Sequence, residues 1–305
     1  QERRQLTVAR DGSGDFLTLQ GALDHVPDFS TEPWKIFIKN GDYEELVYFR
    51  NKTNLTIEGE SREGVYVHYP NNEVFNPHPA DVSTNEWLGT FPSRRAAFAA
   101  DHCTDLTLRN FTVATTVTGQ AEGLLLNGNR IYLEDMIIRG SGDALQSNGP
   151  AYFRNCRLEG HGDTVLGRGP AYFKNCTIVT SGPFAYIRNG SSCHGDVFVD
   201  CTMIGKGDKA VFARTNGTYP NAEFVLIDCR LDGIRPEGWS GLEKDGNTYV
   251  RYWEAGSVNL SDGKPADTSR RAPGSRVLDP VKDKALIELY RNPAWVLGGW
   301  DPMKK

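Results

Sequence analysis

A short repeated unit is the strongest constraint on the fold of this chain. Each copy is an apolar, strand-like run that ends in Asn-Cys or Asp-Cys, and the copies end at Cys156, Cys176, Cys201 and Cys229. These cysteines are 20, 25 and 28 residues apart, and repeats of this length indicate stacked supersecondary units. Each unit is rich in strand formers and too short to hold a strand, a crossover helix and a returning strand. The sequence therefore predicts a parallel β-helix with one coil per repeat.

A second motif, Gly-x-Gly-Asp, follows several of these strand-like runs. It occurs at residues 140–143, 160–163 and 205–208. An Asp in such a turn commonly hydrogen-bonds to its own backbone. The motif alone therefore leaves a structural and a chemical role equally open for each Asp.

The remaining segments predict how the solenoid begins and ends. We expect one all-β domain over residues 1–305, with coils over roughly 30–234 and irregular structure over 235–305. Residues 18–26 predict a short amphipathic helix that covers the open end of the first coil. Residues 281–291 predict a second helix, packed on the flank of the solenoid.

Composition excludes several classes of partner. The chain has 34 basic and 39 acidic residues and a net charge of −5, so it lacks the basic character of a nucleic-acid-binding protein. No run is long and apolar enough to span a membrane. Residues 1–4 do not resemble a signal peptide, which fits either a removed signal or a cytosolic chain; of the two we expect an exported protein, a secreted or periplasmic monomer.

The cysteines predict packing rather than disulfides. Equivalent positions in neighbouring parallel strands point the same way, which is unsuitable disulfide geometry, so the repeat cysteines are expected to form a buried column of thiols. Cys103 and Cys193 lie outside this column, and their state stays open. His161 and His194 have no partners at metal-ligand spacing, so no metal or cofactor is predicted.

The order of motifs along the chain resembles that of the pectin methylesterase family. Residues 7–16 resemble the family's opening segment, and Gln120-Ala121 resembles its Gln-Ala-Val-Ala-Leu motif. Between these two, residues 41–45 resemble Gly-x-Tyr-x-Glu. After Gln120 the matches are, in chain order, 142–145 with Gln-Asp-Thr-Leu, 163–167 with Asp-Phe-Ile-Phe-Gly, 213–216 with Gly-Arg-Pro-Trp, and then 236–239 and 266–271. The resemblance covers roughly residues 5–275 and implies a right-handed parallel β-helix that hydrolyses methyl esters of pectin.

The spacing of two Asp residues fits such chemistry. Asp143 and Asp163 are 20 residues apart at the same place in successive units. Because neighbouring strands lie about 4.8 Å apart, we expect the two carboxylates to be about 5 Å apart on one face. Like charges this close favour one ionised and one protonated group, which supplies a nucleophile and an acid.

The resemblance implies a role for each residue of the site. Asp163 is the expected nucleophile, which attacks the C6 carbonyl of a galacturonic acid methyl ester, and Asp143 is the expected general acid and base. Arg214 is expected to hydrogen-bond to Asp163, and Gln120 to donate to the oxyanion. Each also has a structural reading, as a turn Asp, a surface Arg or a polar strand end. The candidates for substrate binding are Arg168, Arg188, Tyr186, Phe212 and Asn216.

Three residues depart from the family pattern. Gly142 stands where the family has a Gln, which removes an oxyanion donor with an expected effect of about 3 kcal/mol on the transition state. Asn216 replaces a Trp that would form a sugar-binding platform, and Thr164 replaces the aromatic residue after the nucleophile. These departures predict an altered substrate-binding surface.

The sequence thus predicts a pectin methylesterase that binds pectic polysaccharide. Three alternatives stay open: a β-helix glycosidase or lyase on polygalacturonate, because paired carboxylates also serve glycosidases; an esterase or thioesterase on another substrate; and a non-catalytic pectin-binding protein.

Overall fold

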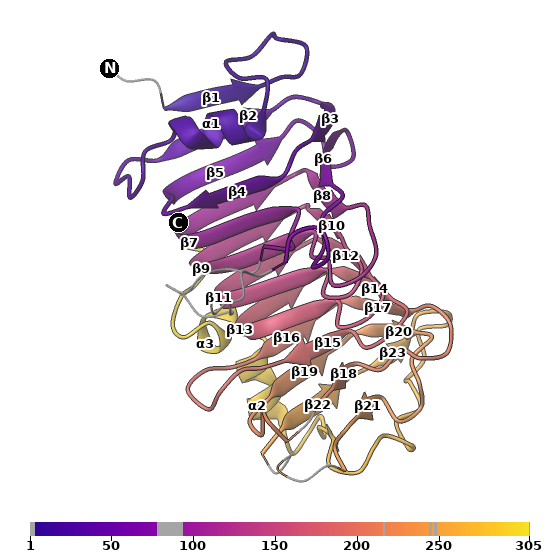
Figure 1. Cartoon of the computed structure of the whole chain (residues 1–305). Coiled ribbons are helices and arrows are strands. Elements are labelled where there is room, and N and C mark those ends of the chain that lie inside the picture. The colour runs from indigo at the N-terminus through magenta and orange to yellow at the C-terminus, as the bar shows by residue number, and fades with distance from the viewer. Residues whose placement is uncertain (1–3, 78–93, 216, 244–245, 247–248, 305) are drawn as a thin grey trace.

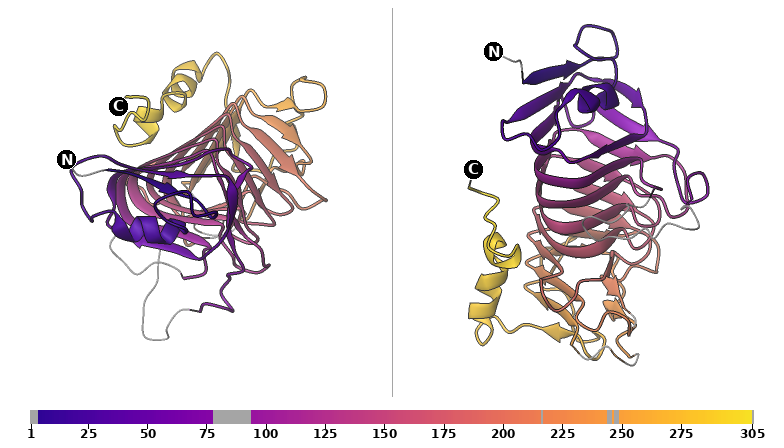
Figure 2. Two further views of the ribbon diagram at one scale, coloured as in Figure 1. Left: turned by 90° about the horizontal axis from the view of Figure 1, so that it is seen from above. Right: turned by 60° about the vertical axis from the view of Figure 1, so that its left-hand side comes forward.

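The chain folds into a right-handed parallel β-helix, as predicted. The computed structural model describes residues 4–77, 94–215, 217–243, 246 and 249–304. Figure 1 shows the strands stacked from the N-terminal end to the C-terminal end, and Figure 2 shows the same stack from above and from the side. Every pair of neighbouring strands within the two long sheets is parallel.

The larger sheet runs the length of the stack. Its strands, in spatial order, are β1 (Gln5–Val8), β2 (Trp34–Ile38), β5 (Thr53–Gly59), β7 (Phe98–Arg109), β9 (Leu124–Glu134), β11 (Leu145–Arg154), β13 (Val165–Lys174), β16 (Asp196–Val199), β19 (Glu223–Ile227), β22 (Arg251–Ala255) and β24 (Arg276–Val277). Four further strands pair alongside this path: β4 (Val47–Arg50), β15 (Ala185–Ile187), β18 (Ala213–Arg214) and β21 (Trp239–Ser240).

The second sheet forms another wall of the solenoid. Its order is β23 (Val258–Asn259), β20 (Arg230–Asp232), β17 (Thr202–Gly205), β14 (Thr177–Thr180), β12 (Arg157–Gly160), β10 (Ile137–Arg139), β8 (Thr112–Thr115), β6 (Val65–Tyr69) and β3 (Gly41–Glu44). This sheet follows the larger one along the stack, and the coils between β3 and β23 each contribute one strand to it.

The register confirms that one repeat makes one coil. Phe153 of β11 pairs with Phe173 of β13, 20 residues later, and Phe173 pairs with Phe198 of β16. The rings stack inside the solenoid at centroid distances of 4.4 Å for both pairs, and Phe224 continues the stack at 4.7 Å. All four side chains are fully buried, so this column forms the centre of the core.

The Asn-Cys and Asp-Cys pairs mark the corner between the two sheets. The residue before each cysteine has φ between 54° and 56°, the left-handed region that Asn and Asp tolerate best among residues with a side chain. These residues are Asn155, Asn175, Asp200 and Asp228. The corner explains why the motif recurs once per coil.

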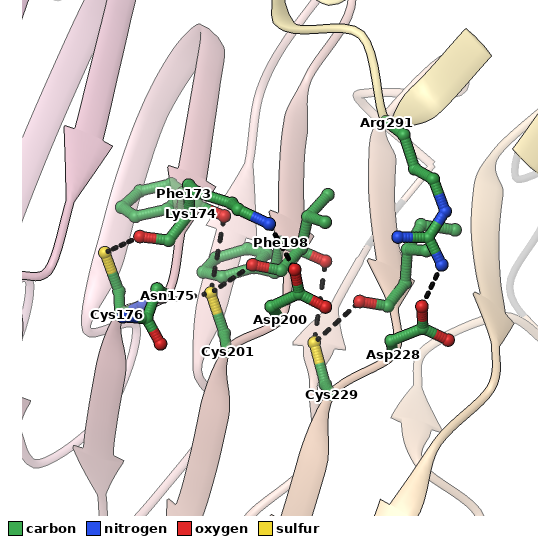
Figure 3. Close-up of polar contacts among 12 residues, drawn as sticks. Phe173, Lys174, Asn175, Cys176, Phe198, Asp200, Cys201, Asp228, Cys229 and Arg291 are labelled. Carbon is green, nitrogen blue, oxygen red and sulfur yellow. Dashed lines mark hydrogen bonds and ion pairs between the residues drawn. The ribbon is translucent and has the colours of Figure 1, made fainter. Parts of the chain in front are cut away.

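The predicted column of buried thiols is present at this corner (Figure 3). The thiol of Cys201 lies 3.3 Å from the carbonyl oxygen of Phe173, and that of Cys229 lies 3.5 Å from the carbonyl oxygen of Phe198. Both are therefore placed to donate a weak hydrogen bond to the preceding coil. Cys103 is buried, Cys193 is exposed, and both are free.

The N-terminal helix agrees with its prediction. Helix α1 (Leu19–His25) begins after Thr18, whose side chain accepts a hydrogen bond of 3.0 Å from the backbone N–H of Gly21. The helix buries its apolar face in the core and lies at the N-terminal end of the stack (Figure 1).

The coils extend beyond both predicted limits of 30 and 234. The first strand of the stack is β1, and the last is β24, because the segment predicted to be irregular contains strands that add further coils. The predicted flanking helix is α2 (Lys284–Tyr290), and it is followed by α3 (Pro293–Val296). Both helices pack beside the larger sheet through Ile287, Tyr290 and Val296 (Figure 2). In the described part of the chain, no helix has the length and apolarity that crossing a membrane requires.

Candidate active site

The two predicted carboxylates occupy equivalent places in adjacent coils. Asp143 lies two residues before β11, and Asp163 lies two residues before β13. The backbone N–H of Asp143 donates a hydrogen bond of 3.1 Å to the carbonyl of Gly162, and Gly142 forms bridges with both Gln120 and Gly162. Gln120, Asp143 and Asp163 therefore lie on three successive coils, in the predicted order.

Both Asp residues have a left-handed backbone. Their φ values are 62° for Asp143 and 42° for Asp163. Asp accepts this conformation more readily than most residues with a Cβ.

Asp163 is held by an arginine from a later coil, as predicted. The Arg214 Nε donates to Oδ1 at 2.8 Å and to Oδ2 at 3.1 Å, and its Nη2 donates to Oδ2 at 2.6 Å. The guanidinium also lies 4.1 Å from the ring centroid of Tyr186, and its hydrogen bonds with Asp163 raise the pKa of Arg214. The contact fixes the Asp163 rotamer and supplies a positive charge beside it.

Asp143 has a different environment. It is buried, and burial is the main reason that its pKa rises from 3.8 to about 6. The positive charge of Arg95, whose Nη2 lies 3.1 Å from Asp143 Oδ2, lowers the pKa, and the negative charge of Asp163 raises it. A carboxyl group in this environment keeps a proton at mildly acidic pH, as a general acid must.

A third carboxylate lies in the same column, and the sequence reasoning missed it. Glu122 stands two residues before β9, as Asp143 does before β11, and its side chain is fully buried. Burial raises the pKa of Glu122 to about 7. Arg95 Nε donates to both of its oxygens, at 2.8 and 2.9 Å, and Gln146 Nε2 donates to Oε1 at 3.1 Å. The shared position relative to successive strands was the signal that could have identified Glu122.

The candidate substrate-binding arginines surround two tyrosines. Arg188 lies 4.9 Å from the ring centroid of Tyr186 and 5.9 Å from that of Tyr219, and Arg168 lies 5.8 Å from Tyr219. Arg168 Nη1 also donates to the carbonyl of Arg188 at 3.3 Å. Tyr186 is only 6% exposed, so its ring supports the guanidinium groups of Arg188 and Arg214 and offers little surface to a sugar.

Phe212 requires a correction. Its side chain is fully buried and packs against Phe224 and Trp239 in the core, so it has no surface on which a sugar could stack. Asn216, which replaces the Trp of the family's sugar-binding platform, lies outside the described residues.

The structure accounts for two departures from the family pattern. A Cβ atom at Gly142 would lie 3.1 Å from the carbonyl oxygen of Gly119, so a side chain at this position is crowded by the preceding coil. Thr164 is fully buried, and its hydroxyl donates to Thr180 Oγ1 at 2.8 Å, which satisfies it inside the solenoid.

The remaining residues that the sequence singled out lie in turns or on the surface. Asp208, the third Asp of the Gly-x-Gly-Asp motif, lies in an exposed turn. His161 is exposed and lies near Ser181, with 3.4 Å between Nδ1 and Oγ. Within the described ranges, no three His, Cys, Asp or Glu side chains form a group that could hold a metal ion.

The described residues thus combine a parallel β-helix with two carboxylates, Asp143 and Asp163, at equivalent places on successive coils. The Pectinesterase family model matches residues 5–273. Pectinesterase QRT1 of Arabidopsis thaliana is 29% identical over 311 residues, which cover 96% of this chain and 79% of that protein. Probable pectinesterase 8 of the same plant is 25% identical, covering 92% of this chain and 73% of that protein.

Solved structures show the same fold. The pectin methylesterase from carrot has a TM-score of 0.78 at 22% identity and covers 96% of this chain and 93% of that one. The pectin methylesterase PemA from Erwinia chrysanthemi has a TM-score of 0.74 at 20% identity, with 99% of each chain covered. The chain belongs to the pectinesterase family, which hydrolyses methyl esters of pectin, and the predicted family, reaction and class of carboxylic ester hydrolase are confirmed.

Proposed function

We propose that this chain removes C6 methyl esters from the galacturonate residues of pectic polysaccharide through an acyl-enzyme on Asp163. An oxygen of Asp163 attacks the ester carbonyl, and the tetrahedral intermediate collapses as the C–O bond to the methoxy group breaks. The departing oxygen takes the proton of Asp143 and leaves as methanol. The product of this step is an anhydride between the galacturonate and Asp163.

The second half-reaction returns the enzyme to its starting state. Asp143, now ionised, accepts a proton from a water molecule that attacks the galacturonate carbonyl of the anhydride. The anhydride bond breaks, and Asp163 leaves as a carboxylate beside Arg214. Gln120 donates a hydrogen bond to the oxyanion in both steps.

The observation that carries this proposal is the contrast between the two carboxylates. Asp163 accepts three hydrogen bonds from a guanidinium, whereas Asp143 is buried and has a raised pKa of about 6. Two neighbouring carboxyl groups whose environments favour opposite protonation states can divide the roles of nucleophile and acid between them.

The substrate side of the site supports a polyanionic ligand. Arg168 lies on β13, the strand that follows Asp163, and Arg188 directly follows β15 on the next coil; we assign both to the carboxylates of neighbouring galacturonates. One structural neighbour is a pectin methylesterase in complex with a hexasaccharide. We further propose that the chain acts as a secreted or periplasmic monomer, since a polysaccharide substrate lies outside the cytoplasm.

The test is methanol release from highly methylated homogalacturonan. Asp163→Asn and Asp143→Asn should each abolish release, while Asp208→Asn, which changes the exposed Asp of the same motif, should keep wild-type activity. Asn is preferred to Ala because it tolerates the left-handed backbone of both catalytic positions. Wild-type release in folded Asp163→Asn would refute the proposal, and shortening of the polysaccharide chain would indicate a glycosidase or lyase.

A further inference from the structure

Arg95 contacts three groups on the catalytic face. Its Nη1 donates to Gln120 Oε1 at 2.8 Å, its Nη2 donates to Asp143 Oδ2 at 3.1 Å, and its Nε donates to Glu122 at 2.8 and 2.9 Å. The side chain is only 12% exposed. A planar guanidinium with several fixed donors suits this arrangement, because one side chain can hold three acceptors in set directions.

Glu122 fixes the position of this guanidinium. It occupies the place of the Val in the Gln-Ala-Val-Ala-Leu motif, and its side chain is fully buried. A buried carboxylate needs a charged partner or a proton, and its two-oxygen contact with Arg95 supplies the partner. Gln146 orients the same carboxylate from the next coil.

The contact with Arg95 determines which way the Gln120 amide points. A guanidinium only donates hydrogen bonds, so the Gln120 amide must turn its oxygen toward Arg95. The amide nitrogen is then left to donate to another acceptor, as an oxyanion donor must, and this choice between oxygen and nitrogen is set before substrate binds.

We propose that Arg95, held in place by Glu122, is a positioning residue that compensates for the glutamine missing at Gly142 by orienting both Gln120 and Asp143. The inference rests on the proposed function of Gln120 and Asp143. A side chain at Gly142 would be crowded by the carbonyl oxygen of Gly119, and Arg95, held by Glu122, orients the donor that remains, Gln120.

Arg95 also belongs to the set of charges around Asp143. The charged groups that face Asp143 from the surrounding coils are Arg95, Glu122, Asp163, Arg188 and Arg214. Loss of a neighbouring positive charge raises the pKa of a carboxyl group, commonly by about 1 unit or more. The free enzyme needs a protonated Asp143, so kcat/KM falls on the alkaline side of its pH profile (the alkaline limb) as Asp143 ionises. Removing Arg95 should therefore shift this alkaline limb to higher pH.

The experiment compares three variants by the pH dependence of methanol release. Arg95→Gln should lower kcat about 10- to 100-fold, with a smaller change in KM, because the oxyanion donor loses its orientation. The alkaline limb of its kcat/KM profile should also shift to higher pH by about one unit. Arg95→Lys and Glu122→Gln disturb the orientation of Gln120 but keep a positive charge near Asp143. In both variants kcat should fall, while the alkaline limb should not shift to higher pH. Arg94→Gln is the matched control, since Arg94 bonds to Asn76 instead, and it should behave as wild type.

The inference is overturned if Arg95→Gln has the wild-type kcat and pH profile, or if its limb moves no more than that of Arg95→Lys. Should Arg95→Gln not fold, Arg95→Lys decides: a lowered kcat with an unmoved limb supports the positioning role, and a wild-type kcat refutes it. An active wild type with inactive Asp163→Asn, together with unchanged Arg95 variants, would refute this inference alone. An inactive wild type would instead refute the proposed function.

Discussion

Asp143 should destabilise the folded protein at neutral pH. Burial gives its carboxyl group a pKa of about 6 in the folded state, against an ordinary value of 3.8. The folded protein therefore binds this proton more tightly than the unfolded chain does. Stability should be highest below the unfolded pKa and should fall as pH rises toward the folded pKa, by about 1.4 kcal/mol per pH unit.

The size of the effect follows from the two pKa values. Between about pH 4.5 and about pH 8 the ionisation of Asp143 should remove about 2 kcal/mol of stability, and the full difference is about 3 kcal/mol above both pKa values. Asp143→Asn has no charge to bury and keeps an acceptor for Arg95. Its stability relative to wild type should therefore improve by about 2 kcal/mol over this pH interval.

Denaturant unfolding at the two pH values measures this difference. The comparison is between variants at each pH, so the titration of groups that do not interact with Asp143 cancels. Asp208→Asn changes an exposed carboxylate and should follow wild type at both pH values. A wild-type pH dependence in Asp143→Asn would refute the reasoning, because the buried carboxylate would then contribute nothing to the slope.

Three further predictions concern the nucleophile, the core and the thiols. Arg214→Lys cannot reproduce the two-nitrogen contact with Asp163, so kcat/KM for methanol release should fall about 10- to 100-fold while the melting temperature changes little. Phe173→Ala removes the middle of the stacked phenylalanine column and should destabilise the protein by about 3–5 kcal/mol in denaturant unfolding. Because Cys193 is exposed and the other five cysteines are buried, a thiol reagent should label one cysteine in the native protein and six after denaturation; labelling of several native thiols would contradict the packed column.

The sequence predicted the features that repeat with the coil. A 20-residue period places Phe153 on Phe173 and Asp143 on Asp163, because parallel strands keep equivalent positions in register. The Asn-Cys and Asp-Cys pairs also have a local cause, the left-handed corner residue. The contact between Arg214 and Asp163 came from the motif order, since their separation of 51 residues carries no periodic signal.

The prediction failed where the chain leaves the regular strand. Phe212 and Arg214 would share a face in an uninterrupted strand, but the backbone bends at Phe212, directly before β18. The bend turns Phe212 into the core, while Arg214 reaches Asp163. The last coils were missed for a similar reason, because long connections before β22 and β24 hide the period that the cysteines reveal earlier.

Arg95 lay beyond any pattern in the sequence, because the coils bring it to Asp143 across 48 residues with no motif of its own. Its function becomes interpretable only when the departures are considered together. An isolated Glu122 in the core would be strongly unfavourable, and an isolated Gly142 would leave the oxyanion with one donor fewer. Arg95 resolves both problems with one side chain, since it neutralises Glu122 and fixes the amide of Gln120. Arg95, Glu122 and Gln120 are therefore expected to act as one unit. The loss of kcat in the double variant Arg95→Gln/Glu122→Gln should then be smaller than the combined losses of the two single variants.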